Sequence, residues 1–191
     1  MAPPSKRLKT EENEGADDGQ RLIVILENCG LQLANVGKDR NVLLCSNKHN
    51  DYLKSKKMDP SKYRPDIVHQ CLLMLLDSPL NRASRLQVYM HTINNILIEV
   101  NPQTRIPRTY DRFCGLMAQL LQKLTIRAEG SSVKLLKIIR NPVELYLPVG
   151  CRKLLTSFQA SNFVSCRDLL PEGSNQSVAI VVGAMAKGKV G

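Results

Sequence analysis

A short, nearly continuous apolar run near the N-terminus constrains the fold more than any other feature of this sequence. The run Arg21-Leu-Ile-Val-Ile-Leu-Glu27 is rich in β-branched residues and lacks the alternation of a strand with one solvated face. A run of this kind is typical of a strand buried on both faces of a parallel sheet. We therefore expect a folded domain that starts at about residue 21.

Residues 1–20 differ from everything that follows. They are polar, with three basic and five acidic side chains and too few apolar ones to form a core. We predict a disordered tail over this range. Its segment Pro3-Pro4-Ser5-Lys6-Arg7-Leu8-Lys9 is either a short nuclear address or plain solvated chain, because three basic residues fit both.

Strand and helix patterns alternate after the first apolar run. Asn94-Asn95 lies between two apolar runs and predicts a hairpin turn. The pattern predicts strands around 42–45, 86–92, 96–100, 135–140, 153–158 and 177–182, and helices over 65–77, 109–124 and 165–170. The alternation indicates the α/β class, with a largely parallel sheet flanked by helices, in a single domain over 21–191.

The charge of the chain favours a polyanionic partner. The net charge is +10, and the first twenty residues carry −2, so the remaining residues carry +12. Nucleic acid is the usual partner of such a surface, and a soluble basic protein without one is the alternative. The six cysteines show no CxxC or metal-ligand spacing, which predicts a reducing compartment and no metal site. No apolar stretch is long enough to span a bilayer, so we expect an intracellular protein without a membrane segment.

One arginine run stands out as a candidate anion-binding site. In Arg105-Ile-Pro-Arg108-Thr-Tyr-Asp-Arg112, Pro107 stiffens the loop, and Arg108 and Arg112 share one face of the following helix. Three guanidinium groups beside a helix N-terminus predict a surface that binds RNA or DNA phosphates. Alternatively, Asp111 neutralises one of them as a local ion pair.

Arg64-Pro65-Asp66 allows two interpretations. Arg64 is either a phosphate ligand held in place by Asp66, or a surface arginine beside an ordinary helix-capping carboxylate. The residues alone favour the second.

The segment Gly183-Ala-Met-Ala-Lys-Gly188-Lys189 has the glycine and lysine spacing of a phosphate-binding loop. Val190 stands where a Ser or Thr would hold magnesium, and no helix follows, so we reject a nucleotide triphosphatase. The loop follows a buried strand, where α/β proteins usually bind ligands, so it is a cofactor loop or a plain turn. The histidines His49, His69 and His91 lack a hydrolytic spacing, and His69 is predicted to be a core histidine.

Two longer segments carry a resemblance to a known family. They are Arg64-Pro-Asp-Ile-Val-His-Gln-Cys-Leu-Leu-Met-Leu-Leu-Asp-Ser-Pro-Leu-Asn-Arg82 and Glu99-Val-Asn-Pro-Gln-Thr-Arg-Ile-Pro-Arg-Thr-Tyr-Asp-Arg-Phe-Cys-Gly-Leu-Met117. The chain resembles, from about Arg21 to its end, the ribosome-biogenesis pseudouridine methyltransferases of small-subunit ribosomal RNA. These proteins are of the SPOUT class, with a trefoil-knotted α/β fold.

The resemblance implies an enzyme that uses S-adenosylmethionine to methylate the ring nitrogen N(1) of a pseudouridine. It implies a nuclear, nucleolar homodimer that works with small-subunit rRNA and other ribosome assembly factors. It also implies that Asp66 steadies Arg64. No residue of this sequence can be named as the general base. The implied RNA-binding residues are Arg64, Arg105, Arg108 and Arg112, and the implied cofactor-binding residues are Thr156, Gly183, Gly188, Lys189 and Val190.

The chain departs from the family at two places. Lys187 stands where relatives more often carry histidine or arginine, and the family continues past Gly191 with a loop and a helix. That segment completes the knot, closes the cofactor site and builds much of the dimer interface, so we expect an incomplete knot and a dimer only where the segment is present. The alternative function is a non-catalytic rRNA-binding assembly factor.

Overall fold

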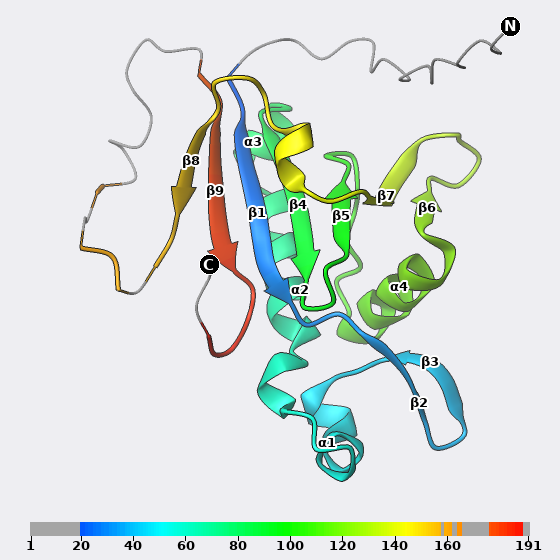
Figure 1. Ribbon diagram of the computed structural model, residues 1–191. Coiled ribbons are helices and arrows are strands. Elements are labelled where there is room, and N and C mark those ends of the chain that lie inside the picture. The colour runs from blue at the N-terminus through cyan, green and yellow to red at the C-terminus, as the bar shows by residue number, and fades with distance from the viewer. Residues whose placement is uncertain (1–19, 158, 162–163, 166–175, 189–191) are drawn as a thin grey trace, which may run out of the picture.

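The computed structural model describes residues 20–157, 159–161, 164–165 and 176–188. They form a seven-stranded sheet in the order β6-β7-β5-β4-β1-β9-β8, with a separate two-stranded sheet (Figure 1). The strands are β1 (Leu22–Cys29), β2 (Leu33–Val36), β3 (Asp39–Leu43), β4 (Leu86–Thr92), β5 (Leu97–Val100), β6 (Thr125–Arg127), β7 (Lys134–Ile139), β8 (Arg152–Leu155) and β9 (Val178–Gly183). The helices are α1 (Ser46–Ser55), α2 (Pro65–Leu76), α3 (Pro79–Arg82) and α4 (Tyr110–Lys123), with short 3₁₀ turns η1 (Pro60–Lys62) and η2 (Val143–Tyr146).

The strand predicted from the first apolar run is the central one. β1 pairs in parallel with β4 on one side and with β9 on the other, and β8 continues the parallel half beyond β9. β5, β7 and β6 add an antiparallel half, so five of the seven strands run in one direction. This arrangement confirms the predicted α/β class, and the β4–β5 hairpin turns at Asn94 and Asn95 as expected.

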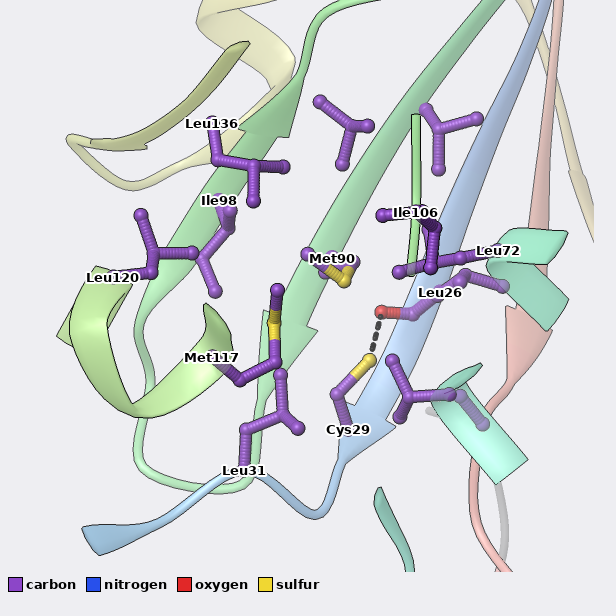
Figure 2. Packing of buried hydrophobic residues seen from close by; sticks show 14 of the residues in the cluster. Leu26, Cys29, Leu31, Leu72, Met90, Ile98, Ile106, Met117, Leu120 and Leu136 are labelled. Atoms are coloured by element: carbon purple, nitrogen blue, oxygen red, sulfur yellow. Dashed lines mark hydrogen bonds between the residues drawn. The ribbon is translucent and has the colours of Figure 1, made fainter. Parts of the chain in front are cut away.

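The main hydrophobic core lies between one face of the sheet and the helices α2 and α4. Leu26 and Met90 from the sheet meet Leu72 of α2 and Met117 of α4 (Figure 2). The buried residues of α4 are Phe113, Met117 and Leu120, whose spacing places them on one face of the helix. A smaller cluster on the other face is covered in part by residues of η2 and the segment around it, including Val143, Leu147 and Cys151.

Some predicted elements differ from the structure. The strand expected at 42–45 ends at Leu43, because Cys45 has the extended conformation of a helix N-cap and α1 follows it. Helix α1 was not predicted, because Leu53 is its one buried residue and its other positions show no apolar stripe. The predicted tail, apart from residue 20, and the predicted helix at 165–170, apart from Ser165, lie outside the described residues. No helix in the described part of the chain has the length and apolar character to cross a membrane.

Candidate RNA-binding surface and cofactor-binding edge

The direction of Arg105 is set by its two neighbours. Thr104 and Ile106 are both buried, and the Thr104 hydroxyl donates a hydrogen bond of 2.7 Å to the carbonyl oxygen of Leu135. Side chains alternate along an extended chain, so anchoring these two residues inward turns Arg105 outward to solvent.

His69 fastens the other end of this loop. Its side chain is 2% exposed, and its Nε2 lies 2.7 Å from the carbonyl oxygen of Pro107. A carbonyl oxygen only accepts, so Nε2 is the donor. The ring also stacks on Phe113 of α4, with ring centres 4.5 Å apart. His69 is therefore a hydrogen-bonded core histidine, as predicted, and it ties the arginine loop to both α2 and α4.

Arg105, Arg108 and Arg112 line one cavity of about 900 Å³ between α2, α3 and residues 102–108. The structure thus brings the three arginines of the run to one cavity. Arg82 of α3 lines the same cavity and was not predicted. Arg82 reaches the cavity only because the turn after α2 folds back beside residues 102–108. No local sequence pattern predicts this contact.

The ion pairs in this region differ from the predicted alternative. Asp111 does not neutralise an arginine of the run; it forms its ion pair with Lys48 of α1. Asp77 instead lies 2.7 Å from Nη1 of Arg108, and both of these side chains are at least half exposed. Exposed pairs of this kind contribute little to stability, so Arg108 is oriented by Asp77 while remaining available to a stronger anion.

Arg64 forms a two-point contact with Asp66. Nε donates at 2.8 Å to Oδ1, and Nη2 donates at 2.6 Å to Oδ2. These hydrogen bonds raise the pKa of Arg64 and lower the pKa of Asp66. Arg64 is therefore held by Asp66, as in the first of the two interpretations. It does not line the cavity, so it forms a separate point of positive charge at the start of α2.

Replacing Asp66 with asparagine is expected to release Arg64 with little loss of stability. The pair is about one-third exposed, so the free energy of unfolding should fall by less than about 1 kcal/mol. The affinity for RNA should fall by on the order of tenfold, because the Arg64 guanidinium loses its fixed orientation. Filter binding compares this variant with Asp51→Asn, which removes an exposed carboxylate on α1. Equal affinities of the two variants would show that Asp66 has no such role.

Two of the predicted cofactor residues, Thr156 and Gly183, lie at the carboxyl ends of β8 and β9. Thr156, just after β8, makes two hydrogen bonds to the carbonyl oxygen of Val181, from its hydroxyl at 2.9 Å and its amide at 3.1 Å. Gly183 ends β9, and Ala184 donates at 2.7 Å to the carbonyl oxygen of Glu27 in β1. The loop after β9 therefore lies against the end of the central strand (Figure 1).

The turn at Gly188 requires a glycine. Its φ of +133° is one that side-chain-bearing residues rarely adopt, and a Cβ there would lie 2.9 Å from the sulfur of Met185. The Met185 side chain thus packs directly against the backbone of this turn. Lys189 and Val190, the other two predicted cofactor residues, lie outside the described residues.

Arg64 lies beside the end of the central strand. Gly30 follows β1, and a Cβ at Gly30 would lie 2.1 Å from the carbonyl oxygen of Lys62 and 2.9 Å from the amide nitrogen of Arg64. On the same side, hydrogen bonds from Ser61 lower the pKa of Asp59, and the charges of Lys62 and Lys187 act in the same direction. The turn before Arg64 is thus packed against the end of β1, and Lys187 of the loop after β9 is near enough to influence the charge of Asp59.

A charged cluster that the sequence did not reveal lies at the ends of β1 and β4. His91 Nδ1 is 2.9 Å from a carboxylate oxygen of Glu27, and Nε2 is 2.8 Å from Oδ1 of Asn95, which also accepts from Asn141. Both ring nitrogens therefore donate, and the imidazole carries a positive charge. Burial lowers the pKa of His91, but the hydrogen bonds to Asn95 and Glu27 and the charge of Glu27 outweigh it and raise the pKa overall.

The contribution of this cluster to stability should depend on pH. Because the folded-state pKa of His91 is raised, the stabilisation is complete below its ordinary value of 6.5 and is lost as the pH rises through the folded-state value. We expect His91→Gln to be less stable than the wild type at pH 6 and closer to it at pH 9. Urea unfolding at both values measures this, and a difference in stability that grows with pH would contradict it.

The fold and its two candidate sites define an α/β protein with an arginine-lined cavity and a glycine-bearing loop at the carboxyl end of its parallel strands. The chain belongs to the EMG1/NEP1 methyltransferase family, whose model matches residues 24–191. This result confirms the resemblance found in the sequence.

Named relatives and a solved structure agree with this membership. The chain is 56% identical over 187 residues to the mouse "Ribosomal RNA small subunit methyltransferase NEP1", covering 98% of this chain and 75% of that protein. It is 49% identical over 211 residues to the human protein of the same name, covering 100% and 85%. It also resembles the crystal structure of Archaeoglobus fulgidus Nep1 bound to S-adenosylhomocysteine, with a TM-score of 0.74, 32% identity, and 90% and 81% of the two chains covered.

Proposed function

We propose that this protein transfers a methyl group from S-adenosylmethionine to N(1) of a pseudouridine in small-subunit ribosomal RNA during ribosome biogenesis. The observation that carries the proposal is the adjacency of the two sites: the turn that ends at Arg64 packs against the end of β1, and the loop after β9 is bonded to that same strand. Membership of a methyltransferase family and a structural relative bound to S-adenosylhomocysteine support it.

The arginine side chains bind the RNA backbone. Arg105, Arg108 and Arg112 hold phosphates around the cavity, and Arg64, steadied by Asp66, holds a phosphate nearer the cofactor loop. Phosphate contacts provide affinity and register without reading sequence. When the RNA backbone is bound at both places, a base flipped out between the two bound phosphates can reach the cofactor site at the carboxyl ends of β8 and β9.

Thr156, Gly183 and Gly188, together with Lys189 and Val190, would hold S-adenosylmethionine. Thr156 and Gly183 lie at the carboxyl ends of the parallel strands β8 and β9, where α/β proteins usually bind ligands, and this position supports such a site. The bound cofactor supplies an electrophilic methyl group on a positively charged sulfur. The protein's own contribution is to orient the base and exclude water. The rate enhancement therefore comes mainly from holding the base close to the methyl group, and no side chain is assigned as general base.

We extend the proposal to the place and assembly of the protein. A role on ribosomal RNA places it in the nucleus, at the nucleolus, in contact with other assembly factors. Homodimer formation is supported by apolar side chains in and around η2, where Leu145 is 69% exposed and Val149 is fully exposed. Sedimentation at micromolar concentration tests the dimer.

Titration calorimetry with S-adenosylmethionine and S-adenosylhomocysteine tests the cofactor site. We expect both to bind, and Thr156→Val to weaken binding roughly 3- to 10-fold by removing one hydrogen-bonding hydroxyl. Thr109→Val, at the start of α4, is the control and should leave cofactor affinity unchanged. Absence of cofactor binding, with RNA binding retained, would favour a non-catalytic rRNA-binding assembly factor.

A further inference from the structure

The cavity beside the arginine loop has the walls of a nucleotide pocket rather than those of a flat phosphate-binding surface. Its volume of about 900 Å³ lies near the upper end of the roughly 300–1,000 Å³ of ligand pockets. Several apolar side chains from α2 and the loop line it: Leu73, Leu76, Pro102, Ile106 and Pro107. A planar base can bury its face against such a lining.

The charge of the cavity suits a phosphate. Four arginines and one carboxylate, that of Asp77, line it, a net charge of +3. Within the part of the chain that the structure describes, Arg108 is the one of these arginines with a carboxylate in ion-pair range. Arg82 and Arg112 therefore present guanidinium groups whose favoured partner, a phosphate, has to come from a ligand.

Hydrogen-bonding groups lie beside this charge. Asn81 Nδ2 donates at 2.9 Å to the carbonyl oxygens of Leu76 and Pro102, which ties the end of α2 to the loop. Its Oδ1 is buried and receives no hydrogen bond from the described residues. Gln103 also lines the cavity, and its side chain is exposed. Amide and carboxylate groups are the ones that recognise the edges of unpaired bases.

We propose that this cavity holds one unpaired nucleotide of the bound RNA, distinct from the nucleotide that is methylated. The base lies on the apolar lining beside Gln103, and its phosphate is held by Arg82 and Arg112. The nucleotide is distinct because Thr156, Gly183 and Gly188, the cofactor residues that the structure describes, do not line the cavity. It belongs to an RNA chain because the arginines extend beyond the cavity to Arg64. This inference rests on the proposed function and deepens it.

The phosphate contact is tested with Arg82→Gln. The control is Arg85→Gln, which removes an exposed arginine three residues further along that is not part of the cavity lining. The probe is the shortest fragment of small-subunit rRNA that the wild type methylates. We expect Arg82→Gln to bind it about tenfold more weakly, with a salt slope lowered by about 0.7, and Arg85→Gln to match the wild type.

The base contact is tested by removing one base of the fragment at a time. At one position other than the methylated one, an abasic nucleotide should weaken binding to the wild type about tenfold. The same abasic RNA should lose much less affinity for Gln103→Ala, because this variant lacks the side chain that contacts the base. Free mononucleotides should bind far more weakly than the fragment. A site that binds free UMP or AMP as tightly as the fragment would overturn the assignment to RNA.

These experiments distinguish failure of the nucleotide pocket from failure of the proposed function. If Arg82→Gln lowers the salt slope but no abasic position is coupled to Gln103, the cavity binds backbone only and the nucleotide pocket is refuted. If Arg82→Gln matches Arg85→Gln and no abasic position is coupled to Gln103 while methyl transfer continues, the inference fails and the proposed function stands. If the wild type neither binds nor methylates the rRNA, both fail together.

Discussion

Replacing Gly30 with alanine is expected to lower the free energy of unfolding by about 1–3 kcal/mol, as overpacking does, and to weaken RNA binding. The added Cβ would lie 2.1 Å from the carbonyl oxygen of Lys62 and 2.9 Å from the amide nitrogen of Arg64. Both are backbone atoms, so no side-chain rotation relieves the contact. The turn before α2 has to move away from β1, and Arg64 moves with it.

Gly115→Ala is the matched control for this prediction. Gly115 lies within α4, and a Cβ there would meet nothing within 4 Å. Alanine forms helices better than glycine by up to about 1 kcal/mol, so this variant should be equal to the wild type or more stable. Urea unfolding and RNA binding are measured on both variants. A Gly30→Ala protein with wild-type stability and affinity would show that the close approach does not position Arg64.

Reversing the charge of Arg108 is expected to have the largest effect on RNA binding. Arg108→Glu removes a guanidinium from the cavity and faces a new carboxylate towards Asp77, whose Oδ2 is 2.7 Å from Arg108 in the wild type. Loss of a hydrogen bond to a charged group weakens binding about 10- to 150-fold, and the repulsion adds to this. The salt slope should also flatten by about 0.7 for each phosphate that the variant no longer binds.

Arg85→Glu separates a local effect from one of net charge. It makes the same change in charge at an exposed arginine outside the cavity lining. Its affinity should fall only slightly, and its salt slope should stay that of the wild type. An unchanged slope for Arg108→Glu would mean that the arginine run does not contact phosphate.

Much of the fold could be predicted because its central elements have strong periodic patterns. The apolar run of β1 and the stripe of α4 are long enough to identify a buried strand and an amphipathic helix. Helix α1 was missed because its stability comes from docking Leu53 against Leu44 and Tyr63, not from a pattern of its own. Strand β6 has three residues and depends on pairing with β7, so no local signal marks it.

The candidate site was only partly predictable, for a related reason. The arginines of the run are close in sequence, so their convergence follows from the helix and the stiff loop. Arg82 joins them through the turn after α2, and the contact of Glu27 with His91 joins residues 64 positions apart. At Arg64 the residues alone favour a surface arginine beside a helix-capping carboxylate. The resemblance to a family favours instead a phosphate ligand held by Asp66. The two-point contact with Asp66 agrees with the interpretation that the resemblance favours.

The central claim is tested most directly by methyl transfer from labelled S-adenosylmethionine to small-subunit rRNA. The wild-type protein is incubated with rRNA that carries pseudouridine and with a matched transcript that carries uridine, and the product nucleosides are separated by mass spectrometry. We predict that label enters the pseudouridine-containing rRNA as N(1)-methylpseudouridine at one position and does not enter the uridine transcript. A protein that binds both the cofactor and the rRNA but transfers no label to pseudouridine would contradict the proposed function.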